Sequence, residues 1–204
     1  MIHQNPISGF EDNYSKYQSL SFKQQIQMLV TELDNNTAKE IPLSALYPKL
    51  NVKRRRLYDV INVFTAIGCS RKSGVDFLIW NGKSHIISEL ISQIKSHHIK
   101  NWNLSLDELF PANHCVSLTS LASAFLLLFA ALDVDTIDLR TACSFFSRDT
   151  NRYKTTLCKM YQIILILSAL DIVTKTDKVC KIKLLSPYLE CLTESNPEIV
   201  PTSI

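Results

Sequence analysis

The stretch NVKRRRLYDVINVFTAIGC, residues 51–69, places a run of four cations directly before an apolar segment with helical periodicity. Apolar side chains recur every three or four residues, which places them on one face of a helix: Leu57, Val60, Ile61, Phe64 and Ile67. Gly68 follows at a position where a helix commonly ends. The stretch therefore predicts a helix that begins within the cations and packs against a core.

The polar side chains of this predicted helix lie away from its apolar face. With about 100° of rotation per residue, Arg55, Asp59 and Asn62 fall opposite the core, and Arg54 and Tyr58 flank them on one edge. Cations at a helix N-terminus oppose the helix macrodipole, so helix stability does not explain the run. A solvated helix start or a nuclear import signal would explain it without a nucleic-acid site.

Base reading is the functional alternative for this run of cations. A recognition helix enters the major groove of DNA with its first residues toward the base edges. An Arg guanidinium can donate to O6 and N7 of guanine together, which gives roughly 1–3 kcal/mol of discrimination. We expect Arg55 to read bases, with its guanidinium held by Asp59 four residues later. Lys53 and Arg54 are expected to contact phosphates, which adds affinity but little sequence information.

The neighbouring segments complete a winged-helix pattern. Residues 19–36 have helical spacing and end in two asparagines, and residues 41–50 predict a short second helix with Pro42 in its first turn. After the third helix, residues 69–83 predict two short strands that turn at Ser73–Gly74. Three helices followed by a hairpin form a winged helix-turn-helix domain.

The rest of the chain predicts a second unit of the same kind. Residues 84–98 predict an amphipathic connecting helix, and residues 101–115 a polar linker. Residues 117–132 then repeat the pattern of the first helix, and KMYQIILILSALDIV (159–173) aligns without gaps on RLYDVINVFTAIGCS (56–70). The predicted fold class is therefore mainly α with small β wings, arranged as tandem winged helix-turn-helix domains of which the second is degenerate.

The second recognition helix has lost the polar residues of the first. The exchanges are Cys158 for Arg55, Lys159 for Arg56, Gln162 for Asp59 and Leu165 for Asn62. Residues 163–167 are apolar without a break, and a helix that is apolar nearly all round is buried. We therefore expect this helix to read no bases and to pack against another surface. Arg at positions 158 and 159 would then disrupt folding or assembly.

Charge is distributed unevenly along the chain. The 204 residues carry a net charge of only +3, but residues 51–83 hold seven Lys/Arg and two Asp/Glu, a local net of +5. Residues 103–150 hold two Lys/Arg and six Asp/Glu, a net of −4. Residues 151–183 return to +5, which is either a phosphate-binding surface or a solvated basic face. Local basic patches of this kind favour a polyanion as partner.

No signal in the sequence indicates an enzyme, a cofactor or a metal site. The chain has only four Gly, without a glycine-rich phosphate loop or a nucleophile elbow. Its cysteines form no C-x-x-C pair, so we expect reduced thiols in an intracellular protein rather than zinc ligands: Cys69, Cys115, Cys143, Cys158, Cys180 and Cys191. The longest apolar run, residues 121–132, is too short to span a bilayer, and the polar N-terminus is no signal peptide.

The motif in residues 51–69 resembles the DNA-binding domain of the E-two-F/DP family of cell-cycle transcription factors. That family carries an Arg-Arg-any-Tyr-Asp core followed by Asn-Val, matched here by Arg55, Arg56, Leu57, Tyr58, Asp59, Asn62 and Val63. The resemblance covers residues 19–83 and places Trp80 at the wing tryptophan of the family. It implies that Arg55 and Arg56 read a GC-rich core in promoter sites of the TTTCCCGC kind, with Tyr58 in support.

Two features depart from the family pattern. The wing holds Val75 and Asp76 where cations or Asn are typical, which leaves Arg71 and Lys72 as its cations. The N-terminal basic arm, which reaches the T-rich half of the site in the family, is represented only by Lys16. Typical members pair with a partner subunit, whereas atypical members carry two such domains in one chain. The predicted duplication resembles the atypical plan.

The sequence therefore predicts a nuclear transcription regulator that binds double-stranded DNA sequence-specifically, without a cofactor, a membrane or enzyme activity. The predicted DNA-binding residues are Lys53, Arg54, Arg55, Arg56, Tyr58, Asp59, Asn62, Arg71 and Lys72. Dimerisation is expected through residues 117–190, with a family partner or within the chain as a pseudo-dimer. The alternative is a winged-helix protein-interaction or assembly subunit with non-specific DNA contact.

These predictions divide the chain into five segments. They are a disordered lead (1–18), a winged-helix DNA-binding domain (19–83), a connecting helix and linker (84–115), a second, degenerate winged helix (116–190) and a flexible tail (191–204).

Overall fold

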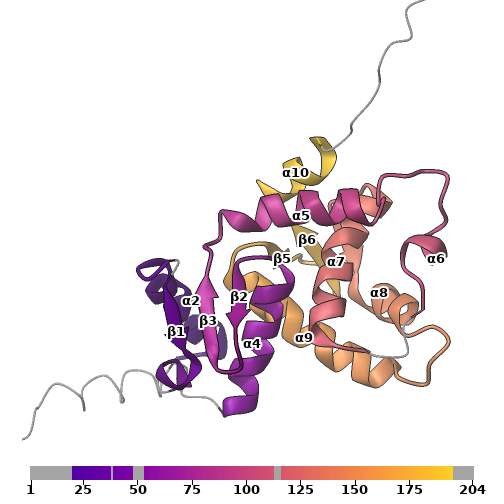
Figure 1. The fold of residues 1–204 in the computed structure, drawn as a ribbon. Helices are drawn as coiled ribbons and strands as arrows, with labels where there is room; N and C mark the ends of the chain where they lie inside the picture. The colour runs from indigo at the N-terminus through magenta and orange to yellow at the C-terminus, as the bar shows by residue number, and fades with distance from the viewer. Residues whose placement is uncertain (1–19, 38, 48–52, 113–115, 195–204) are drawn as a thin grey trace, which may run out of the picture.

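The computed structural model describes residues 20–37, 39–47, 53–112 and 116–194, and its elements form two units of similar order (Figure 1). The N-terminal unit comprises α2 (Phe22–Asp34), β1 (Glu40–Pro42), the 3-10 helix η1 (Leu43–Ala45), α4 (Arg54–Ala66), β2 (Ser70–Ser73) and β3 (Phe77–Trp80). The C-terminal unit comprises α7 (Leu118–Leu132), β4 (Thr136–Asp138), α8 (Leu139–Phe146), α9 (Tyr153–Ala169), β5 (Val173–Lys175) and β6 (Lys181–Leu184). Between them lie α5 (His85–Ser96) and α6 (Leu106–Leu109), and α10 (Tyr188–Glu194) follows.

The first helix confirms the periodicity seen in the sequence. Ser21 caps α2 by accepting from the Gln24 backbone N–H, while the Gln24 side chain accepts from the Ser21 backbone N–H. The apolar stripe faces the core, where Ile26 and Leu33 are almost fully buried. The cap and the stripe together explain why the helix starts and packs at this place.

The second predicted helix was wrong in its first part. Residues 40–42 form the strand β1 instead, which pairs antiparallel with β3, and the short helix η1 follows. Pro42 is the last residue of this strand and the N-cap of η1, not a first-turn residue of a longer helix. Because β1 is the edge of the sheet β1-β3-β2, the missing N–H of a proline is tolerated there. Residues 48–52, which include the remainder of the prediction, lie outside the described residues.

The predicted hairpin after the third helix is confirmed. β2 pairs with β3 from Ser70–Trp80 to Ser73–Phe77, and Gly74 takes a φ of 66° in the connecting turn. Trp80 is fully buried, with its ring 5.2 Å from the Phe64 ring. Its indole Nε1 donates to Asp34 Oδ1 at 2.7 Å, which ties the sheet to the end of α2.

The C-terminal unit repeats the element order and the sheet order of the N-terminal unit. The sheet order β4-β6-β5 matches β1-β3-β2. Two backbone hydrogen bonds beside the sheet also occur at equivalent places in both units. The bond from Leu43 N–H to Asp76 C=O (2.9 Å) corresponds to that from Leu139 N–H to Cys180 C=O (2.8 Å). The bond from Asn81 N–H to Cys69 C=O (2.9 Å) corresponds to that from Leu185 N–H to Ile172 C=O (2.9 Å). The two halves therefore share their local geometry as well as their order.

The two units pack on each other through equivalent helices. α4 packs against α7, α2 packs against α9, and α4 also touches α9. The first helix of each unit thus meets the third helix of the other. Lys23 on α2 donates to the hydroxyl of Ser168 on α9 at 3.3 Å. The buried apolar side chains of both units form one continuous cluster, so the described parts of the two units share one core.

α5 bridges the units, as a connecting helix is expected to do. Gln93 Nε2 donates to the Ala66 carbonyl at the end of α4 (3.1 Å), and Ser123 on α7 donates to Gln93 Oε1 (2.5 Å). Gly68, with a φ of 80°, lets α5 approach closely, because a Cβ there would lie 2.5 Å from the Glu89 Cβ. α5 and α10 lie at the upper side of Figure 1, opposite the start of α4.

Several predicted boundaries need correction. The polar linker contains the short helix α6, which has its own capping box between Ser105 and Glu108. α10 makes residues 191–194 helical, although they were predicted as tail. The lead and the rest of the tail lie outside the described residues. Within the described residues, no helix has the length and apolar character needed to cross a bilayer.

The cysteines confirm the expectation of core thiols only in part. Cys69 and Cys143 are buried, and burial raises the pKa of the Cys143 thiol to about 12. Cys180 and Cys191 are partly exposed, whereas Cys158 is exposed on α9. Cys115 lies outside the described residues. An exposed thiol at position 158 shows that this face of α9 is not packed into the core.

Candidate nucleic-acid interface

The N-terminal end of α4 presents a cluster of cations to solvent. Lys53 occupies the N-cap position without a side-chain cap, and Arg54, Arg55 and Arg56 form the first turn. All four side chains are exposed. The opposite face is fully buried and fixes the helix on the core: Leu57, Val60, Ile61, Val63 and Phe64. Uncapped N–H groups, the positive end of the helix dipole and four cations therefore coincide, which favours an anion at this end.

Arg54 is tied to the wing by polar and aromatic contacts. Its Nη2 lies 3.2 Å from Tyr58 Oη and 3.5 Å from Asp76 Oδ1, and its guanidinium lies 5.6 Å from the ring centroids of both Tyr47 and Tyr58. The hydrogen bond to Tyr58 raises the pKa of the Arg54 guanidinium. The Tyr58 hydroxyl also lies within hydrogen-bond distance of Asp76 Oδ1, at 3.3 Å. These contacts fix the direction of Arg54.

Arg55 and Arg56 differ in how they are held. Arg56 Nη1 lies 3.9 Å from Asp59 Oδ2, an ion pair between an exposed arginine and a half-buried aspartate three residues later. The predicted pairing of Asp59 with Arg55 is therefore wrong, and a long, solvent-accessible pair of this kind contributes only about 0.2–1 kcal/mol. Arg55 has no side-chain hydrogen bond or ion pair with any residue the structure describes. Its five donors are available to a ligand.

The wing contributes one cation to the polar face of α4. Lys72 Nζ donates to Asn62 Oδ1 at 2.9 Å, which joins β2 to the helix. Since side chains alternate along a strand, Arg71 lies on the other face of the sheet, together with its cross-strand partner Ile79. The structure thus brings the predicted residues of α4 together with Lys72 but places Arg71 apart from them.

Two residues of this cluster were not among the predicted site residues. Tyr47, just after η1, packs its ring against Arg54. Asp76 at the wing tip, noted in the sequence only as a departure from the family pattern, is the partner of Arg54 and Tyr58. No local sequence pattern marks Tyr47, because its contact with Arg54 depends on how Tyr47 and α4 are placed in the fold.

The positions of α9 that align with Arg55, Tyr58 and Asn62 of α4 face solvent. Tyr161 and Leu165 keep 45% and 36% of their surface exposed, and Cys158 is exposed. The expectation that residues 163–167 would be buried holds for its other four members, Ile163, Ile164, Ile166 and Leu167. Leu165 is the exception, because it occupies the outward stripe of an amphipathic helix. Lys159 makes a contact within the chain, because its Nζ donates to the Val116 carbonyl.

The C-terminal unit divides its cations into paired and unpaired ones. Lys181 Nζ lies 3.7 Å from Asp138, and Lys183 Nζ lies 3.4 Å from Asp135. Five others are exposed and make no side-chain hydrogen bond or ion pair within the described parts of the chain: Arg140, Arg152, Lys154, Lys175 and Lys178. These five are available to an external anion.

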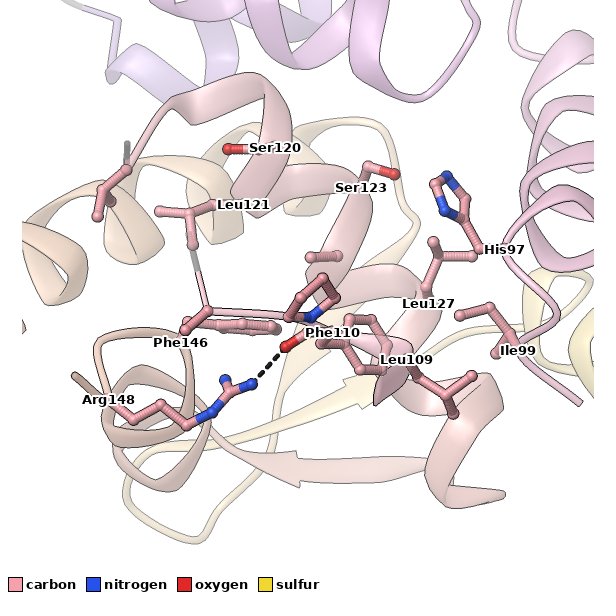
Figure 2. A pocket seen from close by; sticks show the side chains of 14 residues that line it. His97, Ile99, Leu109, Phe110, Ser120, Leu121, Ser123, Leu127, Phe146 and Arg148 are labelled. Carbon is pink, nitrogen blue, oxygen red and sulfur yellow. Dashed lines mark hydrogen bonds between the residues drawn. The ribbon is translucent and has the colours of Figure 1, made fainter. Parts of the chain in front are cut away.

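A separate cavity of about 350 Å³ lies away from α4 (Figure 2). Its walls come from the end of α5, from α6 and from α7, and most are apolar, such as Leu109, Phe110 and Leu127. At one side Arg148 donates to the Phe110 carbonyl and pairs with Asp107 at 2.8 Å. None of its lining residues belongs to α4 or to the β2–β3 wing, so it is no part of the cationic surface.

Comparison with known proteins agrees with this geometry. Residues 18–82 match the family model of the E-two-F/DP family winged-helix DNA-binding domain. The chain is also similar to Transcription factor E2F7 of Danio rerio, with 21% identity over 165 residues. That similarity covers 70% of this chain but only 23% of the relative. The match therefore reaches beyond residue 82, while the chain spans less than a quarter of the length of that relative.

Proposed function

We propose that this chain is a nuclear regulator of transcription that binds double-stranded DNA sequence-specifically, because residues 18–82 match the winged-helix DNA-binding domain of the E-two-F/DP family. The observation that carries the proposal is the position of Arg55 and Arg56. They are exposed at the N-terminal end of a helix whose opposite face is fully buried. This is the part of a recognition helix that meets base edges in the major groove.

The side chains of α4 divide between base reading and positioning. Arg55, with free donors, and Arg56, held only by its long ion pair with Asp59, are proposed to donate to guanine O6 and N7 in a GC-rich core. Lys53 and Lys72 are proposed to contact phosphates. Arg54 is also proposed to contact a phosphate. Its side chain is already held by Tyr58 and Asp76, so less conformational entropy is lost when this side chain is ordered on DNA.

The C-terminal unit is proposed to be a second, degenerate winged helix that completes a pseudo-dimer within one chain. Its sheet order, its repeated backbone hydrogen bonds and the reciprocal packing of α2 on α9 and α4 on α7 support this. Two-fold dimers use the same surface on both subunits. The shared core supports the same conclusion, because buried apolar side chains of the two units form one cluster.

A binding titration tests the proposal. Wild-type chain and the double variant Arg55→Ala/Arg56→Ala are titrated onto a duplex with a TTCCCGCC-type site and onto a scrambled duplex, at two salt concentrations. Wild type is expected to prefer the site by roughly 10³-fold or more. The double variant is expected to lose most of this preference while it keeps salt-sensitive binding, because the phosphate contacts remain.

Lys95→Ala is the matched control, because Lys95 is an exposed cation at the end of α5, on the side of the molecule opposite the start of α4. It should leave the preference unchanged. Equal and weak binding of both duplexes by wild type, unchanged in the double variant, would contradict the proposal. The chain would then be better described as a protein-interaction or assembly subunit with non-specific DNA contact.

A further inference from the structure

We propose that α9 is a second base-reading helix with changed specificity, which reads A·T base pairs beside the GC-rich core read by α4. This inference rests on the proposed function, because it needs the chain to sit on a duplex through α4. It replaces the expectation from sequence that α9 reads no bases.

The outward stripe of α9 is equivalent to the base-reading stripe of α4. On α4 this stripe consists of Arg55, Asp59 and Asn62. With the alignment of the two helices, the corresponding residues of α9 are Cys158, Gln162 and Leu165. Asp59, Asn62 and Gln162 are all half-buried, while the remaining residues of both stripes are exposed. The same positions therefore face outward on both helices, although their chemistry differs.

The chemistry of this stripe suits adenine and thymine. A Gln side chain can pair bidentately with N6 and N7 of adenine, and small apolar groups contact the C5-methyl group of thymine. Gln162 supplies the amide, and two exposed residues, Cys158 one turn and Thr155 two turns nearer the N-terminus of α9, supply small groups. No guanidinium occupies this stripe, so the feature that selects guanine on α4 has no counterpart on α9.

α9 also reaches further at its N-terminal end than α4 does. α9 has 17 residues and α4 has 13, and in the alignment the difference is one turn at the N-terminus. That turn presents Lys154 and Thr155 to solvent, with Arg152 directly before it. The first turns of a recognition helix are the part that approaches the base edges. The added turn therefore places a cation and a small side chain where a groove contact begins.

Charge around this stripe favours DNA over a protein as the occupant. Arg152 and Lys154 lie at the start of α9, and Lys175 and Lys178 lie on β5 and in the β5–β6 turn. None of the four has a side-chain partner in the residues that the structure describes. A neutral stripe with unpaired cations beside it fits bases flanked by phosphates.

The packing of the two units brings both helices to one side of the molecule. α4 touches α9, and the N-terminal ends of both lie at the lower side of Figure 1, with α5 and α10 at the upper side. One duplex can therefore meet both helices, since a pseudo-two-fold arrangement presents equivalent helices to adjacent half-sites.

The test is a selection of flanking sequence by the full chain. Duplexes with a CCCGCC core are mixed with duplexes whose core is scrambled, all with randomised base pairs on both sides, and are bound, recovered and sequenced with wild type, Gln162→Ala and Gln27→Ala. Wild type should enrich A·T pairs on one side of the core. Gln162→Ala should reduce this enrichment roughly 5- to 100-fold, as expected for one bidentate adenine contact. Gln27→Ala, a half-buried glutamine on α2, should leave it unchanged.

The outcomes separate the two proposals. Selection of the core with no flanking preference would overturn the reading by α9 and leave the proposed function intact. Loss of core selection as well would overturn the proposed function. Equal A·T enrichment by wild type and Gln162→Ala would also overturn the inference, because the preference would then come from groove shape or another residue. Circular dichroism and thermal unfolding of Gln162→Ala confirm that the variant is folded.

Discussion

α4 and α9 are built on one plan and present different surfaces. At equivalent positions their inward faces are both apolar and fully buried: Leu57 and Met160, Val60 and Ile163, Ile61 and Ile164, Phe64 and Leu167. Their outward stripes share almost nothing, with Arg55, Asp59 and Asn62 on one helix and Cys158, Gln162 and Leu165 on the other. The comparison teaches that the buried positions maintain the helix on its core, while the outward positions are free to change what is bound.

The largest expected effect concerns the shared core. Trp80→Ala should lower the free energy of unfolding by about 3–5 kcal/mol, because a fully buried ring and its bond to Asp34 are lost. The equivalent change in the C-terminal unit, Leu184→Ala, should cost about 2–5 kcal/mol. Urea unfolding followed by circular dichroism measures both.

Since the two units share one core, each variant should shift a single transition of the whole chain. Trp102→Ala is the control, because this side chain is 65% exposed and its loss should change stability by less than about 0.5 kcal/mol. Two separate transitions, of which each variant moves only one, would show that the units fold independently.

The second prediction exchanges the outward chemistry of the two helices. Arg55→Ala should lose about 1–3 kcal/mol of preference for guanine in the core, and Cys158→Arg should gain a guanine preference of similar size beside it. Cys158 is exposed, so Arg at this position should not disturb folding, contrary to the expectation from sequence. Competition binding with single-base variants of the duplex measures both effects. If Cys158→Arg unfolds the chain, the outward placement of this stripe is wrong.

The third prediction compares the starts of equivalent helices. Asp138 caps α8 by accepting from the backbone N–H groups of Arg140 (2.9 Å) and Thr141 (3.0 Å), whereas Pro42 gives η1 no side-chain cap. Asp138→Ala should therefore destabilise the chain by about 0.5–2 kcal/mol at neutral pH. Pro42→Ala, the matched change in the N-terminal unit, removes no cap and should cost less.

The Asp138 effect should depend on pH in one direction. The hydrogen bond from the Thr141 N–H, together with that from Arg140 and the nearby Lys181, lowers the pKa of the Asp138 carboxyl. Its contribution is therefore fully present above the unfolded pKa of about 3.9 and is lost as the pH falls through the lower folded pKa. Wild type and Asp138→Ala should converge in stability at acid pH. A difference that persists there would exclude the carboxylate as its cause.

The smallest expected effect concerns the phosphate contacts of the C-terminal unit. Lys175→Ala and Lys178→Ala should each reduce the slope of log K against log salt by about 0.9, with a similar loss on every sequence. Lys183→Ala is the matched control in the same hairpin, because Lys183 is paired with Asp135. Unchanged slopes for Lys175→Ala and Lys178→Ala would show that these two lysines contact no phosphate.

The sequence predicted those elements whose signals are local. The apolar spacing of α2 and α4, the stop at Gly68 and the turn at Gly74 were all readable, since periodicity and turn residues act within a few positions. β1 was not predicted, because a three-residue strand forms only where a neighbouring strand, here β3, can pair with it. The early start of α9 was missed as well, since Arg152 provides no side-chain cap to signal it.

The candidate site was predictable in composition but not in its pairings. The run of cations on α4 and their exposure followed from the helical wheel. Asp59 pairs with Arg56 and not with Arg55, and Arg54 pairs with Asp76 of the wing. Both pairings depend on side-chain directions, which residue spacing does not determine. The exposure of Leu165 within an apolar run likewise required knowing which neighbours cover α9.

The central claim is that one chain presents two winged helices to one site. It is tested most directly by native mass spectrometry of the chain bound to a duplex that holds a single TTCCCGCC-type core. The account predicts one chain per duplex, because α7 and α9 occupy the surfaces of α4 and α2 that a second copy would need. Two chains per duplex, with no single-chain complex at any ratio, would contradict it.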